Sequence, residues 1–430
     1  MAGTGQSVSR EEDYVVGDGR TLKHLAFFEE LASLDESDNG WRSVSAGLVV
    51  LRLIDAWVED GPDVVLADAW GIRAVRAAIE ETAVGSPVRA ILGGVVDALE
   101  RSAASDMHAV APRLIAYARA LEFENRWNLA ADVYRAVIAH AHPIEDSDFA
   151  IDAHVQLGVC LRQVGDLESA EAAYRTAGQI AGATGDFVGV VRARVGEGKV
   201  ALARGNLPRA ERLLDDAIVD ATGPAMRGVR VMARHDRAHV AALRGDYEFT
   251  IKLAYQALEE AELPLERDRL LADIGAAFND LGVYSAACDA FLVLTVTAQE
   301  PFVRWAATLN LLEIAQKSGA EPLFERYRRE LAPVALPPRL ATDYHLYVGQ
   351  GLVKFGQPSA GLAAFERALE IAAEHGFNQA AFQIEGVLAD ARRSERKRQA
   401  AETTWVAPSE ELDGIARALR EMRDEVGAGS

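Results

Sequence analysis

The apolar and small residues between positions 153 and 177 are spaced as in a helical hairpin. They recur at intervals of three and four residues, which places them on one face of an α-helix. Gly165 interrupts the pattern and divides the stretch into two helices. Gly158 on the first helix and Ala170 on the second leave room where the helices cross, and Tyr174 fills the space beside that crossing. The stretch therefore predicts two helices packed against each other.

The glycine that separates the two helices recurs along the chain. It is found at Gly165, Gly205, Gly245, Gly282, Gly319 and Gly356, so the repeat interval is 37 to 40 residues. Seven residues before most of these turns is a small residue, namely Gly158, Gly198, Ala238, Gly275 and Gly349, with Leu312 as the exception. The second helices carry small or aromatic residues at matching positions, such as Ala210, Phe291 and Phe365. One more copy, around Ala118 and Tyr134, fits without a glycine turn, and the whole pattern predicts an array of helical hairpins.

These repeats resemble the tetratricopeptide repeat family, whose unit has about 34 residues and whose arrays stack hairpins into superhelices. The longer unit of this chain is similar to the extended repeats of some peptide-binding regulators and scaffolds in that family. The resemblance covers roughly residues 110 to 390. It implies an all-α fold, a right-handed solenoid of helical hairpins, and it is specific for the fold but not for the function.

Four further helices are expected before the repeats, over about 21–34, 41–58, 62–82 and 87–103. Residues 1–20 show no period, and we expect them to form a disordered tail. We interpret residues 21–104 as an N-terminal helical subdomain that covers the apolar end of the array, as terminal units do in solenoids. The second of its helices is apolar on several sides, but Arg52 and Asp55 interrupt it before the roughly 20 residues that a bilayer requires. We therefore expect no membrane span.

The repeat array is expected over residues 105–391. Between positions 320 and 338, Phe324 and Arg328 replace the expected small residues, so we expect a degenerate hairpin and a local change of pitch. Residues 392–430 are interpreted as a charged linker and a terminal amphipathic helix, with one apolar face made of Leu412, Ile415, Leu419 and Met422. This helix either packs on its own array or docks on another chain.

Composition restricts the kinds of partner. Among the 430 residues, 65 are acidic and 45 are basic, which leaves a net charge of -20. Such a chain repels a phosphate backbone, so we expect no nucleic-acid partner. Cys160 and Cys288 are isolated and lie in apolar repeat helices, which indicates a reducing compartment. Because the first residues also lack the order of a signal peptide, we expect a cytoplasmic protein.

The sequence carries little that indicates chemistry. It contains no phosphate-binding glycine loop, no zinc-spaced cysteine pair, and neither GxSxG nor HExxH, so we expect no enzyme and no cofactor. His235 and His239 share a helix face and would hold a metal ion if a third ligand were nearby. The alternative, which we favour, is that both are neutral contacts in the groove, and no metal is bound. His140 and His142 are expected to be solvated at a helix end.

In this family the first helix of each hairpin lines the concave groove. Transferred through the glycine register, that face consists of Arg119, Arg162, Arg192, Lys199, His235, His239, Arg269 and Asn279. Five of these eight are permanently cationic, which would concentrate an acidic or carboxylate-bearing peptide on an otherwise acidic chain. The alternative is that the cations pair with groove acids such as Asp152 and Asp236. The lysine and paired asparagines of family members that clamp a terminal carboxylate are absent.

Charged residues in the middle of the array stand where the repeat pattern expects apolar ones. Glu197 is expected to accept ion pairs from Arg194, Arg234 or Arg237, because an unpaired buried charge is costly. The functional expectation is a scaffold or adaptor that binds another protein or a peptide in its groove. The alternative is a regulator that senses a signalling peptide, with the N-terminal helices as its output.

Overall fold

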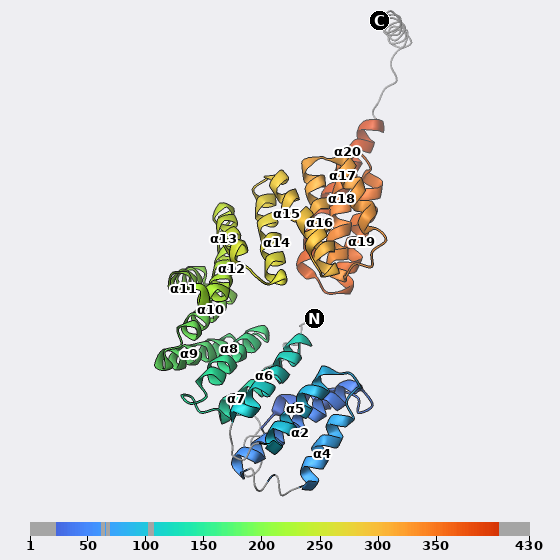
Figure 1. Cartoon of the computed structure of the whole chain (residues 1–430). Coiled ribbons are helices and arrows are strands. Elements are labelled where there is room, and N and C mark those ends of the chain that lie inside the picture. The colour runs from blue at the N-terminus through green and yellow to red at the C-terminus, as the bar shows by residue number, and fades with distance from the viewer. Residues whose placement is uncertain (1–22, 62–64, 66–68, 102–106, 404–430) are drawn as a thin grey trace, which may run out of the picture. The chain divides into compact units, whose positions relative to one another are not determined.

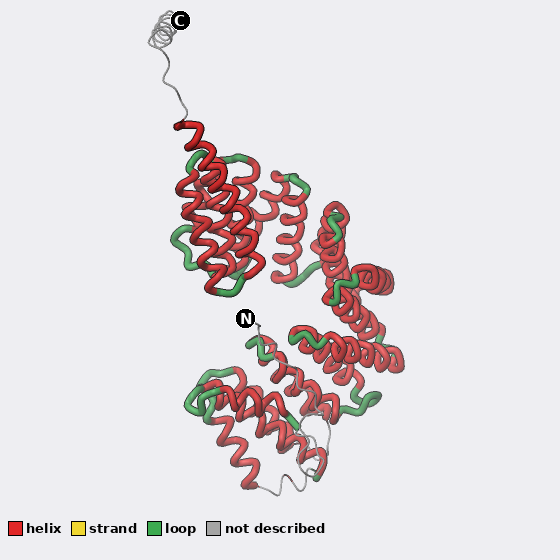
Figure 2. Tube along the Cα trace, turned by 180° about the vertical axis from the view of Figure 1, so that it is seen from behind, coloured by secondary structure: helices red, strands yellow, loops and turns green. Residues whose placement is uncertain are grey.

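The computed structural model describes residues 23–61, 65, 69–101 and 107–403. Within these ranges every regular element is a helix, as Figure 2 shows. The prediction of an all-α solenoid of helical hairpins is thus confirmed. None of the described helices is long and apolar enough to cross a membrane. The expected tail and the expected terminal amphipathic helix lie outside the described residues.

Contacts within the chain group it into two compact units, residues 1–266 and 267–430. The boundary falls in the first turn of α14 (Pro264–Asp280). Each unit has its own apolar clusters, so each is described by itself.

The helices expected before the repeats correspond to α1 (Leu25–Ser33), α2 (Asn39–Glu59), α4 (Ala69–Glu80) and α5 (Pro87–Arg101). Asp38 caps α2 by accepting a hydrogen bond from the Gly40 amide, as an N-cap aspartate does. Phe27 and Trp57 are fully buried between these helices and the first repeat hairpin. α2 packs on α4, α5 and α7, and α5 packs on α6. The N-terminal helices therefore share one core with the first hairpin.

Four hairpins complete the first unit, and each packs on the next (Figure 1). They are α6 (Met107–Phe123) with α7 (Trp127–His140), α8 (Ser147–Gln163) with α9 (Leu167–Thr184), α10 (Phe187–Ala203) with α11 (Leu207–Asp220), and α12 (Arg227–Leu243) with α13 (Tyr247–Glu260). The short 3₁₀ helix η2 (Pro224–Met226) leads into α12. The first helices also pack on one another, α6 on α8, α8 on α10 and α10 on α12.

The hairpins turn through one residue in the left-handed conformation. The φ angle is 87° at Gly165, 72° at Gly205 and 76° at Gly245. In the hairpin without a glycine, Asn125 takes the same role with φ of 60°. Asparagine tolerates this conformation better than most side chains do, which explains how the copy without glycine still turns.

The residue after each glycine turn starts the second helix. Asp166, Asn206 and Asp246 each accept a hydrogen bond from the backbone amide three residues further on, at 3.0, 3.2 and 3.2 Å. A side-chain oxygen in this position satisfies one of the free amides at a helix N-terminus. The glycine turn and the N-cap together specify where one helix ends and the next begins, and neither depends on contacts with other hairpins.

The ring of Tyr174 lies between two hairpins. A Cβ built on Gly158 of α8 would stand 2.7 Å from Tyr174 Cζ, and one on Gly196 of α10 would stand 2.3 Å from Tyr174 Cδ1. Both distances are too short for a real carbon contact. Ala170 is fully buried beside this ring, and Ala210 takes the same position in the next hairpin. Small residues therefore allow α8, α9 and α10 to approach one another closely.

The second unit continues with the same hairpins. Its helices are most of α14, then α15 (Tyr284–Thr297), α16 (Pro301–Ser318), α17 (Glu321–Leu331), α18 (Pro338–Lys354), α19 (Pro358–Glu374) and α20 (Asn378–Thr403). Gly275 faces the ring of Phe291, and Gly349 faces the ring of Phe365. The hairpin expected to be degenerate contains the short helix α17. There Phe324 is fully buried against α18, where a Cβ on Gly351 would stand 2.1 Å from Phe324 Cε2.

Candidate functional site

Six of the eight predicted groove residues lie on first helices of the first unit: Arg119 on α6, Arg162 on α8, Arg192 and Lys199 on α10, and His235 and His239 on α12. We call the surface of α6, α8, α10 and α12 that carries them the groove face. Arg269 and Asn279 lie on α14 and belong to the second unit.

One aspartate joins two of the predicted arginines on the groove face. Arg119 Nη2 lies 3.0 Å from Asp152 Oδ2, and Arg192 Nη2 lies 2.8 Å from Asp152 Oδ1. Asp152 is on α8, and the arginines come from the helices on either side of it. The pairing alternative is therefore correct at this point of the groove face. Each guanidinium still has further donors, since an arginine carries five N–H groups.

A cleft of about 430 Å³ opens beside this bridge. Its charged lining consists of Arg119, Arg192, Asp148, Asp152 and Asp186, and its apolar lining of Pro112, Ile115, Phe149 and Ile151. The side chains of three consecutive hairpins thus meet in one depression. Five of the nine lining residues are charged, so this depression is more polar than the mainly apolar pockets that hold small ligands.

The lysine of the groove face is also paired. Lys199 Nζ lies 3.3 Å from Asp236 Oδ2 on the next first helix. His235 is half-buried and His239 is exposed on the same helix. Among the described residues, no group of three or more His, Cys, Asp and Glu side chains is arranged to hold a metal ion. Within the described part of the chain, His235 and His239 therefore have no third side chain beside them that would complete a metal site.

Arg162 differs from Arg119, Arg192 and Lys199, because no acid in the described part of the chain forms an ion pair with it. Its Nε atom is buried and makes no hydrogen bond. The Tyr174 hydroxyl is close enough for the guanidinium to act on its pKa, but it too makes no hydrogen bond of normal geometry. Both atoms are therefore buried without a hydrogen bond of normal geometry, which is uncommon in a folded protein.

Comparison with family models and with curated proteins at the level of sequence gives no match. Among solved structures, a signal transduction ATPase with a tetratricopeptide repeat sensor, from Pyrococcus horikoshii, is similar over 87% of this chain and 69% of its own, with 11% identity and a TM-score of 0.52. The chain has a tetratricopeptide-repeat fold. The apo form of RapI covers 81% of the chain and 99% of its own, with 11% identity and a TM-score of 0.44. A tetratricopeptide repeat protein from Parabacteroides merdae covers 64% and 98%, with 12% identity and a TM-score of 0.43.

In the second unit of this tetratricopeptide-repeat chain, the two remaining groove residues differ in burial. Asn279 is 7% exposed and donates to Glu313 Oε2 at 3.1 Å. Lys317 donates to Asn279 Oδ1 at 3.4 Å and pairs with Glu313 at 2.9 Å. Arg269 is exposed on the same helix as Asn279. Asn279 is therefore held by its neighbours on α16.

The expectation that Glu197 accepts the arginines in the middle of the array is wrong. Arg194 pairs with Asp220, Arg234 with Glu260 at 2.7 Å, and Arg237 with Asp215 at 2.8 Å and Glu211 at 3.2 Å. All these acids lie on the second helices α11 and α13, whereas Glu197 lies on the first helix α10. Glu197 itself comes no closer than 3.9 Å to Arg209, and burial raises its pKa.

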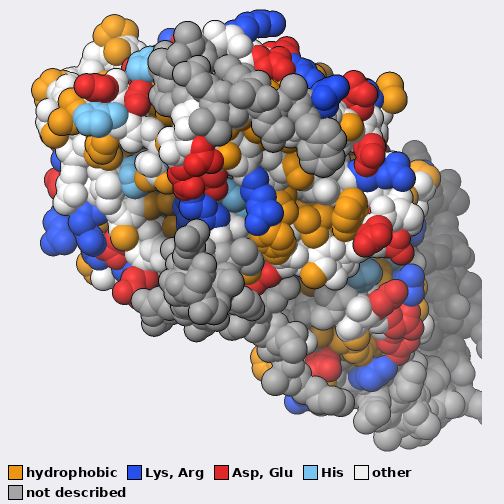
Figure 3. Space-filling view, turned by 90° about the horizontal axis from the view of Figure 1, so that it is seen from below, with side chains coloured by type: hydrophobic (Ala, Val, Ile, Leu, Met, Phe, Trp, Pro, Cys, Tyr) orange, Lys and Arg blue, Asp and Glu red, His pale blue; other side chains and the backbone are white. Residues whose placement is uncertain are grey.

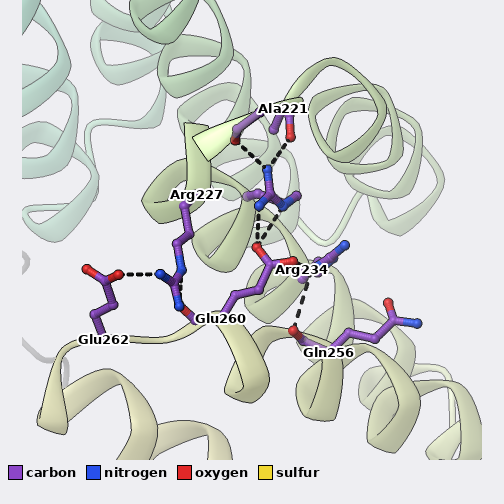
Figure 4. Close-up of polar contacts among 8 residues, drawn as sticks. Ala221, Arg227, Arg234, Gln256, Glu260 and Glu262 are labelled. Carbon is purple, nitrogen blue, oxygen red and sulfur yellow. Dashed lines mark hydrogen bonds and ion pairs between the residues drawn. The ribbon is translucent and has the colours of Figure 1, made fainter. Parts of the chain in front are cut away.

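Glu260 is the centre of the best-connected of these clusters (Figure 4). Its carboxylate accepts from Arg230 and Arg234, while its backbone carbonyl accepts from Arg227 at 2.7 Å. Arg230 also donates to the carbonyls of Ala221 and Gly223, at 2.7 and 3.1 Å. This cluster therefore holds the connection between α11 and α12 in place. The side chains of Arg230 and Arg234 take part in these internal contacts.

A second buried cluster, which the sequence analysis missed, ties the N-terminal helices to the first hairpin. His24 precedes α1 with φ of 61°, and its ring nitrogens lie 3.1 Å from Asp55 Oδ2 and 3.3 Å from Asp132 Oδ2. His140 Nε2 lies 2.8 Å from Asp55 Oδ1, and its side chain is 7% exposed. The expectation of a solvated His140 is therefore wrong, because α2 covers the end of α7.

Ionisation of this cluster follows from its contacts. Burial alone would lower the pKa of His24, but the attraction of the Asp132 and Asp55 carboxylates, with a hydrogen bond to Asp55, raises it to about 9. Burial likewise acts to raise the pKa of Asp55, yet His140, His24 and Lys23 hold it well below its ordinary value. His24 is thus a cation and Asp55 an anion near neutral pH.

On the surface of the molecule, acidic and basic side chains are interspersed with apolar ones, as Figure 3 shows for one face.

Proposed function

We propose that this chain is a non-catalytic scaffold or adaptor that binds an extended segment of a partner protein along the groove face of the first unit. The cleft of about 430 Å³ between α6, α8 and α10 is the observation that supports this proposal. It combines apolar walls for partner side chains with arginines that retain free donors for backbone carbonyls or acidic groups.

The Asp152 bridge makes the cleft suitable for an extended segment. Long arginine side chains lose much rotamer freedom when they bind, and this cost reduces affinity. Arg119 and Arg192 are already held by Asp152 before any partner arrives. Part of the conformational entropy of these arginine side chains is therefore already lost when the chain folds, and not when the partner binds.

A cleft-filling variant tests the proposal. A library of hexapeptides, randomised at every position and immobilised on beads, is incubated with the full chain. Pro112→Trp places an indole in the cleft from an exposed position of α6, so peptide retention should fall at least about tenfold without a loss of stability. Arg113→Trp is the matched control, because the next residue on the same helix is exposed but does not line the cleft. No retention by the parent, or equal retention by both variants, would contradict the proposal.

The alternative of a peptide-sensing regulator is supported by one observation. α6 lines the cleft, packs on α5 and forms the hairpin whose second helix contacts α1 and α2. A ligand between α6 and α8 would therefore act on the element that carries the N-terminal helices. Hydrogen exchange of α1 and α2, with and without a selected peptide, tests this: unchanged exchange contradicts it.

We also propose a cytoplasmic location. Cys160 and Cys288 are both free thiols in the described chain. Burial and the nearby Glu122 raise the pKa of the Cys160 thiol, so it stays protonated and unreactive. Fractionation of cells that produce the tagged chain would contradict the proposal if the protein were recovered outside the cytoplasm.

A further inference from the structure

The charged groups that line the cleft between α6, α8 and α10 do not balance one another. They are the arginines Arg119 and Arg192 and the aspartates Asp148, Asp152 and Asp186. Three carboxylates against two guanidinium groups leave one negative charge in excess at neutral pH. The cleft is therefore acidic, although both predicted groove residues in it are arginines.

Asp152 is occupied by the two arginines. Each of its oxygens holds one guanidinium, at 3.0 Å for Arg119 and 2.8 Å for Arg192, and its side chain is only 19% exposed. A carboxylate that is held from both sides in this way has little capacity left for a further cation. The N–H groups that the arginines keep free suit uncharged acceptors such as backbone carbonyls.

Asp148 and Asp186 carry the remaining carboxylates of the cleft. Asp148 is exposed in the first turn of α8, and it forms no hydrogen bond or ion pair with another described residue. Asp186 is the N-cap of α10 and accepts from the Gly189 amide at 3.0 Å, and no cation in the described ranges forms an ion pair with it. A carboxylate accepts about four hydrogen bonds, so both side chains keep capacity for a ligand.

Phe149 supplies an apolar wall next to these acids. It is half-buried and lines the cleft, and its ring centroid lies 5.5 Å from that of His108 on α6 at an interplanar angle of 85°. The methylene groups of a long side chain pack well on such a ring, and a cationic head group is attracted to an aromatic face. The cleft thus combines carboxylates and an aromatic ring, which together suit a long cationic side chain.

We propose that the segment held in the cleft is basic, with an arginine or lysine side chain that donates to Asp148 and Asp186 and packs on Phe149. This inference rests on the proposed function and specifies the chemistry of the partner. The charge of the bound side chain cancels the excess negative charge of the lining. Arg119 and Arg192 donate to backbone carbonyls of the same segment.

The charge of the whole chain favours a partner of the same sign. A net charge of -20 attracts a basic segment and raises the rate of its encounter with the chain. The acidic peptide expected from the sequence would bring its carboxylates to a cleft that already has too many, and like charges placed together lower affinity. A basic and an acidic segment are therefore distinguished by experiment.

Peptide selection with the full chain tests the sign of the partner. The probe is a bead-bound library of hexapeptides randomised at every position. Both ends of each peptide are blocked by acetylation or amidation, so that only side chains carry charge. Retained peptides should be enriched in Arg or Lys at one position by at least about threefold.

Neutralising variants connect the preference to the two aspartates. For a selected peptide, Asp148→Asn and Asp186→Ser should each weaken binding about threefold to tenfold, because each removes one charge partner. Serine is also a good N-cap, so Asp186→Ser should leave the helical circular dichroism unchanged.

The preceding helix α9 offers a matched control for each variant. Glu168 is an exposed acid in its first turn, and Asp166 caps it by accepting from the Ser169 amide at the same distance of 3.0 Å. Neither residue lines the cleft. Glu168→Gln and Asp166→Ser should therefore bind the peptide like the parent.

Asp148→Arg inverts the charge of the lining. It leaves three arginines against two aspartates, so the preference should change from Arg and Lys to Asp and Glu. Glu168→Arg makes the same kind of change outside the cleft and should keep the basic preference.

The outcomes separate this inference from the scaffold proposal. Retained peptides with no basic preference, a preference of the parent for Asp and Glu, or a basic preference that survives Asp148→Arg would each overturn the inference and leave the scaffold proposal standing. Retention of no peptide by the parent would overturn the scaffold proposal, and the basic segment with it.

Discussion

The ring of Tyr174 occupies the space that a side chain at position 196 would need. A Cβ on Gly196 would stand 2.3 Å from Tyr174 Cδ1. Gly196→Ala should therefore lower the free energy of unfolding by about 1 to 3 kcal/mol, because α10 must move away from α9. Urea unfolding followed by circular dichroism measures this change.

Gly182→Ala is the control with the opposite expected sign. Gly182 lies in α9, and a Cβ there would meet nothing within 4 Å. Alanine should stabilise that helix by about 0.5 to 1 kcal/mol. If both variants changed stability equally, the close approach of α9 and α10 would be refuted.

The buried His24 cluster predicts a loss of stability at alkaline pH. The pKa of His24 is raised from 6.5 to about 9 in the folded chain. A raised pKa contributes stability that is complete below the unfolded value, near 6.5, and disappears as the pH rises through about 9. The contribution amounts to up to about 3 kcal/mol. Urea unfolding between pH 6 and about 10 measures it.

His24→Gln should remove most of that alkaline slope, because glutamine does not titrate. His239→Gln is the control, since His239 is exposed on α12, and it should keep the slope of the parent. A parent chain with equal stability at both ends of this range would contradict a charged His24. The depressed pKa of Asp55 adds stability that is lost only in strong acid, well outside this range.

Glu171 should matter more for stability than Glu197. Glu171 is 9% exposed, and its carboxylate accepts from Arg204 and from Arg209. Glu171→Ala leaves both arginines without this partner and should cost about 1 to 2 kcal/mol, since the guanidinium groups are partly solvated. Glu197→Ala removes a carboxylate whose burial is poorly compensated and should change stability by less than about 0.5 kcal/mol. Equal losses in urea unfolding would refute this ranking.

Asn125 should accept glycine but not alanine. Its φ of 60° is the conformation that glycine provides in the other hairpins. Asn125→Gly should leave the melting temperature unchanged or slightly higher, whereas Asn125→Ala should cost about 1 kcal/mol. Thermal unfolding of the two variants measures the difference, and a more stable alanine variant would be inconsistent with the left-handed turn.

The hairpins could be predicted from sequence because their determinants are local. A glycine turn, a capping residue and a small residue seven positions upstream all lie within one repeat, so Gly158 and Gly275 could be assigned to helix crossings. The contact between Tyr174 and Gly196 joins two hairpins, and the sequence places small residues at both 196 and 198 without indicating which one meets the ring. Long-range packing decides that choice.

The groove residues could be placed on helices, but their partners could not be assigned. Arg119 and Arg192 lie 33 and 40 residues from Asp152, about one repeat in each direction. Opposite charges separated by one repeat length would have been a usable signal. His24 offered no such signal, because it lies outside the repeats and its partners Asp55 and Asp132 belong to two different helices.

The Asp152 bridge also has a mechanical consequence. Its two oxygens are held by α6 on one side and α10 on the other, so any flexing that spreads the hairpins at α8 stretches both ion pairs together. Flexing in the opposite direction compresses them. One carboxylate thus restrains the local curvature of the solenoid in both directions, in addition to the packing of Tyr174 between the same hairpins.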